Sequence, residues 1–167
     1  MFALNLQHRL IFPLIFFIGL QWPVLAQPSA TQATPAYRIY DREGKPLSFG
    51  QFSEQARTHE VVLFGEFHND PIVHWLQRML LEDAAADSVR TALGLEMLEF
   101  DDQVIWNEYA AGLLGYNRLK TEAKLWNNHE QDYHPIIETA IEHGMAIVAT
   151  NVPRRYASMA VSHDYVW

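Results

Sequence analysis

The chain has 167 residues, of which 49% are hydrophobic and 13% aromatic, and its formal net charge at pH 7 is −8. This length suits one domain with its own hydrophobic core. The acidic balance repels nucleic acid and excludes the class of proteins that bind it through a basic surface. Because the sequence contains no cysteine, a disulfide framework, a thiol nucleophile and a thiolate metal site are also excluded.

The first 26 residues have the layout of a secretory signal peptide. One positive charge, Arg9, precedes an apolar stretch from Leu10 to Leu20, and small or apolar residues lead to Ala26. The stretch is shorter than the roughly 20 residues that a membrane-spanning helix needs. We therefore expect cleavage after Ala26 and export, with residues 27–36 as a flexible polar linker and residues 37–167 as the folded domain. No cysteine follows the cut, so the usual lipid attachment point of a bacterial lipoprotein is missing.

Strand and helix patterns alternate along the rest of the chain. A short edge strand is expected at Tyr37–Tyr40 and a short helix at Phe49–Ala56. The apolar run Val61–Phe64 predicts a strand buried on both faces. A helix is expected to start at Pro71, because the apolar residues that follow recur at helical spacing, at Ile72, Leu76, Met79 and Leu80.

The second half of the chain continues this alternation. It predicts a strand at Thr91–Leu98, a helix that starts near Asp101 or Asp102, a helix at Asn117–Trp126, a helix that starts at His134, and a strand at Met145–Thr150. Strands that alternate with helices favour a mostly parallel sheet with helices packed on its faces. We therefore predict an α/β fold with helices on both faces of the sheet, in three layers.

Polar side chains follow three of the predicted parallel strands. Glu66 and His68 come after the first, Glu96 lies near the end of the second, and Asn151 and Arg154 follow the third. In open α/β sheets, ligands bind outside the carboxyl ends of the strands. We therefore expect these side chains to converge at one rim of the sheet.

This set suits two kinds of chemistry. Glu66, His68 and Glu96 offer the oxygen and imidazole ligands of a divalent metal such as Zn or Mn, or of iron. Alternatively, one carboxylate serves as a general base beside His68. His74 and Gln77 share a face of the next predicted helix, where they either join the site or are ordinary exposed residues.

Aromatic side chains offer a further possibility. A tyrosinate can ligate ferric haem iron, and arginines meet haem propionates through charge-assisted hydrogen bonds. Arg154, Arg155 and Tyr156 bring both features together in one turn of the chain. Most other aromatic residues are expected in the core. Three late histidines are expected in capping or last-turn positions and not as ligands: His129, His134 and His143.

Three stretches carry a family resemblance. The chain contains GEFHNDPIVHWLQ at residues 65–77, GLEM at 94–97 and YHPIIETAIEHGMAIVATNVPR at 133–154. In sequence and order these stretches resemble the ChaN-like haem-binding uptake family, which belongs to the wider Tiki, TraB and erythromycin-esterase-like superfamily. Within them, Gly65–His68 matches the first GxxH motif of the superfamily, and Glu96 matches the acidic residue on the next strand. The NxPR turn of the family matches Asn151–Arg154.

The resemblance implies an exported, iron-acquisition-linked protein that binds haem. It also implies paired haems held at a dimer interface through a tyrosine, for which Tyr133, Tyr156 and Tyr165 are candidates on chemical grounds. The implied partners are haem, a second copy of the chain, and the outer membrane or an uptake receptor, and the implied location is the periplasm. The expected haem-binding set is His68, His74, Tyr133, Arg154 and Tyr156.

Two features depart from the family pattern. The superfamily has a second GxxH motif in its C-terminal half, and no other GxxH occurs here. The chain ends at Trp167, soon after the NxPR turn, whereas relatives continue, so we expect a partial member. The alternative function is that of a metal-dependent hydrolase of the same superfamily, in which Glu66, His68 and Glu96 hold a metal that activates water. The missing second GxxH counts against it, because a catalytic metal usually needs three protein ligands.

Overall fold

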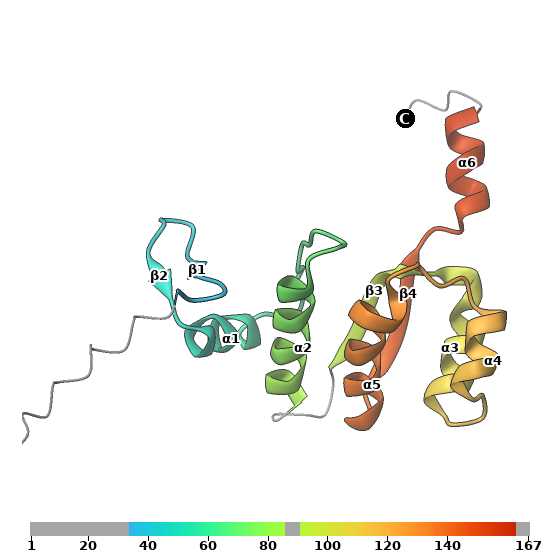
Figure 1. The fold of residues 1–167 in the computed structure, drawn as a ribbon, viewed down its shortest axis with the longest axis horizontal. Coiled ribbons are helices and arrows are strands. Elements are labelled where there is room, and N and C mark those ends of the chain that lie inside the picture. Colours follow the sequence, from blue (N-terminus) through green and yellow to red (C-terminus); the bar gives the residue numbers. More distant parts are fainter. Residues whose placement is uncertain (1–33, 86–90, 163–167) are drawn as a thin grey trace, which may run out of the picture. The chain divides into compact units, whose positions relative to one another are not determined.

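The computed structural model describes residues 34–85 and 91–162 (Figure 1). The described residues from Pro35 onward belong to one compact unit. The expected signal peptide, nearly all of the expected linker and Tyr165 lie outside the described residues. Among the helices that are described, none is long and apolar enough to cross a membrane.

This unit contains both strands and helices, and the predicted α/β class is confirmed. In chain order the elements are β1 (Ile39–Tyr40), β2 (Pro46–Leu47), α1 (Phe49–Arg57), α2 (Pro71–Ala85), β3 (Ala92–Glu99), the 3₁₀ turn η1 (Phe100–Asp102), α3 (Gln103–Ala110), α4 (Tyr116–Glu122), the π-helical turn η2 (His129–Tyr133), α5 (His134–Glu142), β4 (Ala146–Asn151) and α6 (Arg154–Ser162). The short strands β1 and β2 pair antiparallel.

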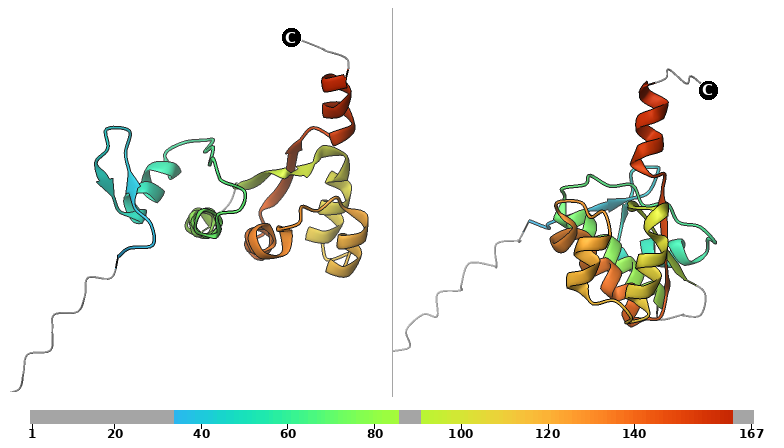
Figure 2. Two further views of the ribbon diagram at one scale, coloured as in Figure 1. Left: turned by 45° about the horizontal axis from the view of Figure 1, so that its top comes forward. Right: turned by 90° about the vertical axis from the view of Figure 1, so that its right-hand side faces the viewer.

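The central pair of strands is parallel. Figure 2 shows β3 and β4 side by side, and their register runs from Ala92 opposite Ala146 to Leu95 opposite Ala149. The pairing becomes irregular toward the carboxyl end of β3. Because β3 and β4 are the one parallel pair among the described residues, the three-layer arrangement stays a prediction.

Helix α5 supplies the centre of the hydrophobic core. Ile136, Ile137 and Ala140 recur at helical spacing and are each at most 2% exposed. The helix contacts α2, β3 and β4, and Trp106 of α3 and Leu119 of α4 belong to the same buried cluster. Burial of each large apolar side chain stabilises the fold by about 1.5–3 kcal/mol. The core therefore joins the sheet to four of the helices.

The predicted strand at Val61–Phe64 is wrong. These residues have no regular secondary structure, and Val61 and Leu63 are 73% and 92% exposed. A strand needs a partner for its backbone N–H and C=O groups. Within the part of the chain that the structure describes, β3 pairs with β4 alone. The apolar run fits a strand by composition, but composition supplies no partner.

Helix α4 also ends earlier than predicted, at Glu122 instead of near Trp126. The next residue, Ala123, is extended, and the backbone N–H of Lys124 donates to the carboxylate of Asp102 at 2.9 Å. A side chain distant in sequence thus takes the hydrogen bond that a longer helix would have used. The polar pattern of this segment could not predict that competition.

Gln103, in the first turn of α3, hydrogen-bonds to the main chain of β4. Its Oε1 accepts from the N–H of Ala149 at 2.7 Å, and its Nε2 donates to the carbonyl of Ile147 at 2.9 Å. Replacement of Gln103 by alanine is expected to lower the free energy of unfolding by about 1–3 kcal/mol, because two main-chain groups lose their partners. Urea unfolding measures this loss.

The control is Asn107→Ala. Asn107 Oδ1 accepts the second hydrogen of Gln103 Nε2 at 2.9 Å, and this hydrogen bond does not involve β4. That variant is expected to cost less than Gln103→Ala. Equal losses in the two variants would contradict a role of Gln103 at β4.

Candidate functional site

The loop between Glu66 and Asp70 is fixed onto the start of α2. Asp70 Oδ1 accepts the backbone N–H of Ile72 at 2.9 Å, which caps the helix, and Pro71 occupies its first position. The N–H of Asp70 donates to the carbonyl of Phe67 at 3.0 Å and closes a tight turn. The predicted helix start is therefore present with Asp70 as its cap, and together they place Glu66 and His68 beside α2.

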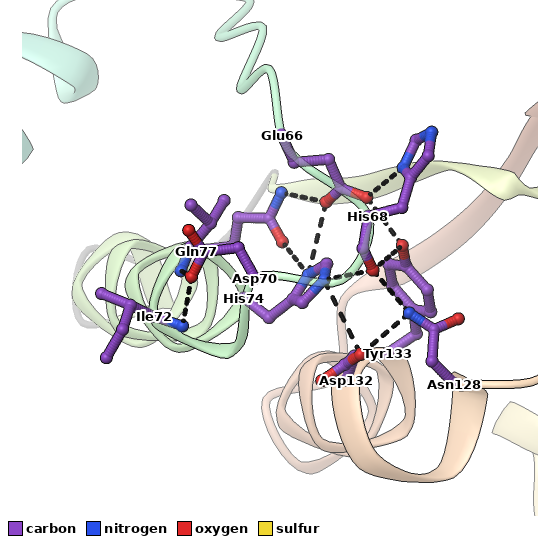
Figure 3. Close-up of polar contacts among 10 residues, drawn as sticks. Glu66, His68, Asp70, Ile72, His74, Gln77, Asn128, Asp132 and Tyr133 are labelled. Atoms are coloured by element: carbon purple, nitrogen blue, oxygen red, sulfur yellow. Dashed lines mark hydrogen bonds and ion pairs between the residues drawn. The ribbon is translucent and has the colours of Figure 1, made fainter.

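The carboxylate of Glu66 is the centre of a network of hydrogen bonds (Figure 3). Its Oε1 accepts from the Tyr133 hydroxyl at 2.7 Å and lies 2.9 Å from His68 Nδ1. Its Oε2 accepts from Gln77 Nε2 at 2.6 Å and lies 3.4 Å from His74 Nδ1. Burial by itself raises the pKa of Glu66, but the hydrogen bonds from His68, Tyr133 and Gln77 and the charge of His74 lower it below its ordinary value. Glu66 is therefore held as a carboxylate.

His74 is buried, and both of its ring nitrogens face protein acceptors. Its Nδ1 lies 3.1 Å from Gln77 Oε1, beside the Glu66 carboxylate. Its Nε2 lies 3.1 Å from the carbonyl oxygen of His68 and 3.9 Å from Asp132 Oδ2. A cofactor at either nitrogen would have to displace one of these contacts. In this arrangement His74 connects α2 to the loop and to η2.

Tyr133 is fully buried at the end of η2, with its ring edge-on to His74 at 4.7 Å between centroids. Burial, and then the hydrogen bond to Glu66 and its negative charge, raise the pKa of the Tyr133 phenol above its ordinary value. The hydroxyl is a donor to Glu66 and resists ionisation. Tyr133 is therefore better suited to hold the carboxylate of Glu66 in place than to ligate iron as a tyrosinate.

His68 is the exposed member of the network, with 47% of its side chain accessible. Because a carboxylate only accepts, Nδ1 carries the proton in the contact with Glu66, and in the neutral form of the ring Nε2 keeps its lone pair. The ring packs edge-on against Trp126 at 4.9 Å between centroids. In Figure 3 the far nitrogen of the ring points away from Glu66. An imidazole oriented by a carboxylate in this way is typical of metal-binding histidines.

A cleft of about 1000 Å³ lies next to this network. Its walls come from residues 56–66, from the face of α2 that carries Leu80 and Leu81, and from the first part of β3. Most of the lining side chains are apolar, and Glu66, His68 and Glu96 all line the same cleft. Three of the five side chains expected at one rim thus line the same cleft, whereas Asn151 and Arg154 do not. However, no group of three His, Asp or Glu side chains in residues 34–85 and 91–162 is arranged to hold a metal ion.

Four of the predicted site residues do not line this cleft: His74, Tyr133, Arg154 and Tyr156. Arg154 starts α6, and its backbone N–H donates to Glu99 at 3.1 Å. Its neighbour Arg155 pairs with Asp101 and lies over the half-exposed ring of Tyr156, 4.7 Å from the ring centroid. The expectation that Arg154 shares a rim with Glu66 and His68 is therefore not met by the described structure.

Two residues of the network were missed by the sequence analysis. Asn128 Nδ2 donates to the carbonyl oxygen of His68 at 2.6 Å and to Asp132 Oδ2 at 2.8 Å. These contacts join η2 to a loop 60 residues earlier in the chain. The only local signal is the spacing of Asn128 and Asp132, four positions apart, which is common on helices and indicates no site.

Comparison with known proteins gives one match. A family model described as "Haem-binding uptake, Tiki superfamily, ChaN" matches residues 52–165. Neither the curated proteins nor the solved structures contain a match to the chain. The matched region includes the whole network around Glu66 and both strands of the parallel pair.

Proposed function

The chain belongs to the ChaN family of haem-binding uptake proteins in the Tiki superfamily, and from this we propose that it binds haem in the cleft beside β3. We propose His68 Nε2 as the ligand of the haem iron. The observation that carries the proposal is the position of His68, exposed at an apolar cleft and oriented through Nδ1 by a buried carboxylate.

The cleft suits a large, flat, apolar group. Its volume of about 1000 Å³ is at the upper end of the usual range for small-molecule sites. Haem, when bound, would supply an iron centre that can be ligated by a protein side chain. The residues of the chain supply the apolar walls, the oriented imidazole and the fixed carboxylate behind it.

The hydrolase alternative is less well supported by this geometry. It requires Glu66 as a metal ligand, but Glu66 already accepts hydrogen bonds from Tyr133 and Gln77 and contacts two imidazoles. A metal would have to replace several of these contacts. We therefore favour a supporting role for Glu66.

We also propose that the protein is exported. The layout of residues 1–26 supports secretion to the periplasm, and the family description supports a place in haem uptake. Dimer formation through paired haems, and association with the outer membrane or an uptake receptor, stay predictions from the family resemblance.

Titration of the purified protein with hemin tests the proposal. We expect a Soret band to develop with the wild type and the affinity to fall roughly 100-fold in His68→Ala, because the iron loses its protein ligand. The matched control is His143→Ala, which removes an exposed imidazole outside the cleft. No spectral change with the wild type would contradict haem binding. A change that is the same in His68→Ala would contradict only the choice of ligand.

A further inference from the structure

The carbonyl oxygen of His68 is contacted by three side chains that come from other elements (Figure 3). Asn128 Nδ2 donates to it at 2.6 Å, His74 Nε2 lies 3.1 Å from it, and the Tyr133 hydroxyl lies 3.5 Å from it. A carbonyl oxygen has two lone pairs, so the two shorter contacts satisfy it. The main chain at His68 is therefore held in place independently of the imidazole ring.

Asn128 is itself fixed by the turn that follows it. The N–H of Asp132 donates to the carbonyl of Asn128 at 2.9 Å, and Asp132 Oδ2 accepts the second hydrogen of the Asn128 amide at 2.8 Å. Because a carboxylate only accepts, this contact decides that the amide nitrogen, and not the amide oxygen, faces His68. Asp132 thus orients Asn128, and Asn128 holds His68.

We infer that Asn128 is a positioning residue for His68, with Asp132 as its support. The inference rests on the proposed function of His68 as the haem ligand. The ring contact with Glu66 sets which nitrogen is protonated, and the carbonyl contact with Asn128 sets where the ring stands at the cleft. Both are needed to direct Nε2 at one point, because a side chain on a mobile main chain has no fixed direction.

Asn128→Ala tests the inference, and Asn127→Ala is a closely matched control, since Asn127 is the adjacent, exposed asparagine. The first measurement uses the haem-free protein. Two-bond ¹⁵N–¹H spectra of the imidazoles are expected to show His68 protonated at Nδ1 in the wild type and in Asn127→Ala. In Asn128→Ala the ring is expected to shift toward protonation at Nε2, because the contact with Glu66 is made for only part of the time.

The second measurement is hemin titration. Asn128→Ala is expected to lower the affinity about 10- to 100-fold and to move the Soret maximum, as loss of an orienting partner does at metal sites. Asp132→Ala is expected to lower the affinity in the same way but by less. If Asn128→Ala does not fold, Asp132→Ala tests the role of Asn128 in its place. If the wild type binds no hemin, the proposed function fails, and the imidazole spectra still test the role of Asn128. Spectra of Asn128→Ala and Asp132→Ala that equal those of Asn127→Ala would overturn the inference.

Discussion

Replacement of Glu66 by alanine is expected to lower the free energy of unfolding by about 3–5 kcal/mol, the usual cost of removing one partner from a buried charged network. The side chain of Glu66 is only 7% exposed. Its loss leaves the Tyr133 hydroxyl and the Gln77 amide without their acceptor, and the buried ring of His74 without its nearest carboxylate.

Urea unfolding at pH 7 measures this change, with Glu60→Ala as the control. Glu60 is an exposed glutamate in the same segment, and its replacement is expected to change the free energy of unfolding by less than about 0.5 kcal/mol. Glu66→Gln keeps the size of the side chain and an acceptor for Tyr133, so its loss is expected to lie between those of the two alanine variants. A loss below about 1 kcal/mol in Glu66→Ala would show that the network does not hold the loop.

The second large effect is expected on acidification and comes from His129 in η2. This ring is only 3% exposed, lies nearly parallel to His134 at 5.8 Å between centroids, and contacts Trp106. Its Nε2 has no hydrogen-bond partner among the described residues. Burial, and then the positive charge of His134, lower the pKa of His129 to about 4. Protonation of His129 therefore opposes folding.

The direction of the pH dependence follows from this shift. The folded state keeps His129 neutral down to about pH 4, whereas the unfolded chain protonates it below its ordinary pKa of 6.5. The unfolded state thus binds more protons between these values, and stability falls as the pH is lowered through that window. The loss approaches about 3 kcal/mol near pH 4, since each pH unit is worth about 1.4 kcal/mol per proton.

Comparison of urea unfolding at pH 7 and pH 4.5 tests this expectation. His129→Gln is expected to lose about 2 kcal/mol less than the wild type between the two pH values. His143→Gln, which replaces an exposed histidine, should keep the wild-type dependence. The lowered pKa of Glu66 also removes stability in acid, but it does so equally in all three proteins and cancels in the comparison. Equal losses in the wild type and His129→Gln would contradict the assignment.

The parts of the fold that local sequence determines were predictable. The start of α2 follows from Asp70 and Pro71, and the buried face of α5 follows from the spacing of Ile136, Ile137 and Ala140. The short apolar runs of β3 and β4 marked a parallel pair that the structure contains. In each case the residues that decide the element lie within the element or next to it.

The parts that depend on distant partners were not predictable. Val61–Phe64 has the composition of a strand, but strand formation depends on a free neighbouring edge, which composition does not encode. Glu66 and His68 are two positions apart, so their contact could be anticipated, whereas the contact of Asn128 with His68 spans 60 residues. The chemistry of its phenol makes Tyr133 a candidate iron ligand, but its burial beside Glu66 makes it a hydrogen-bond donor.

The amide of Gln103 also occupies main-chain groups at the edge of β4. An unpaired row of main-chain groups invites strands of other molecules to add to a sheet and to polymerise. On β4 the side chain of Gln103 imitates the peptide group of such an incoming strand, with one donor and one acceptor at the spacing that Ile147 and Ala149 present. Gln103 thus occupies two main-chain groups with which an added strand would otherwise pair. Its removal is expected to make edge-to-edge aggregation easier.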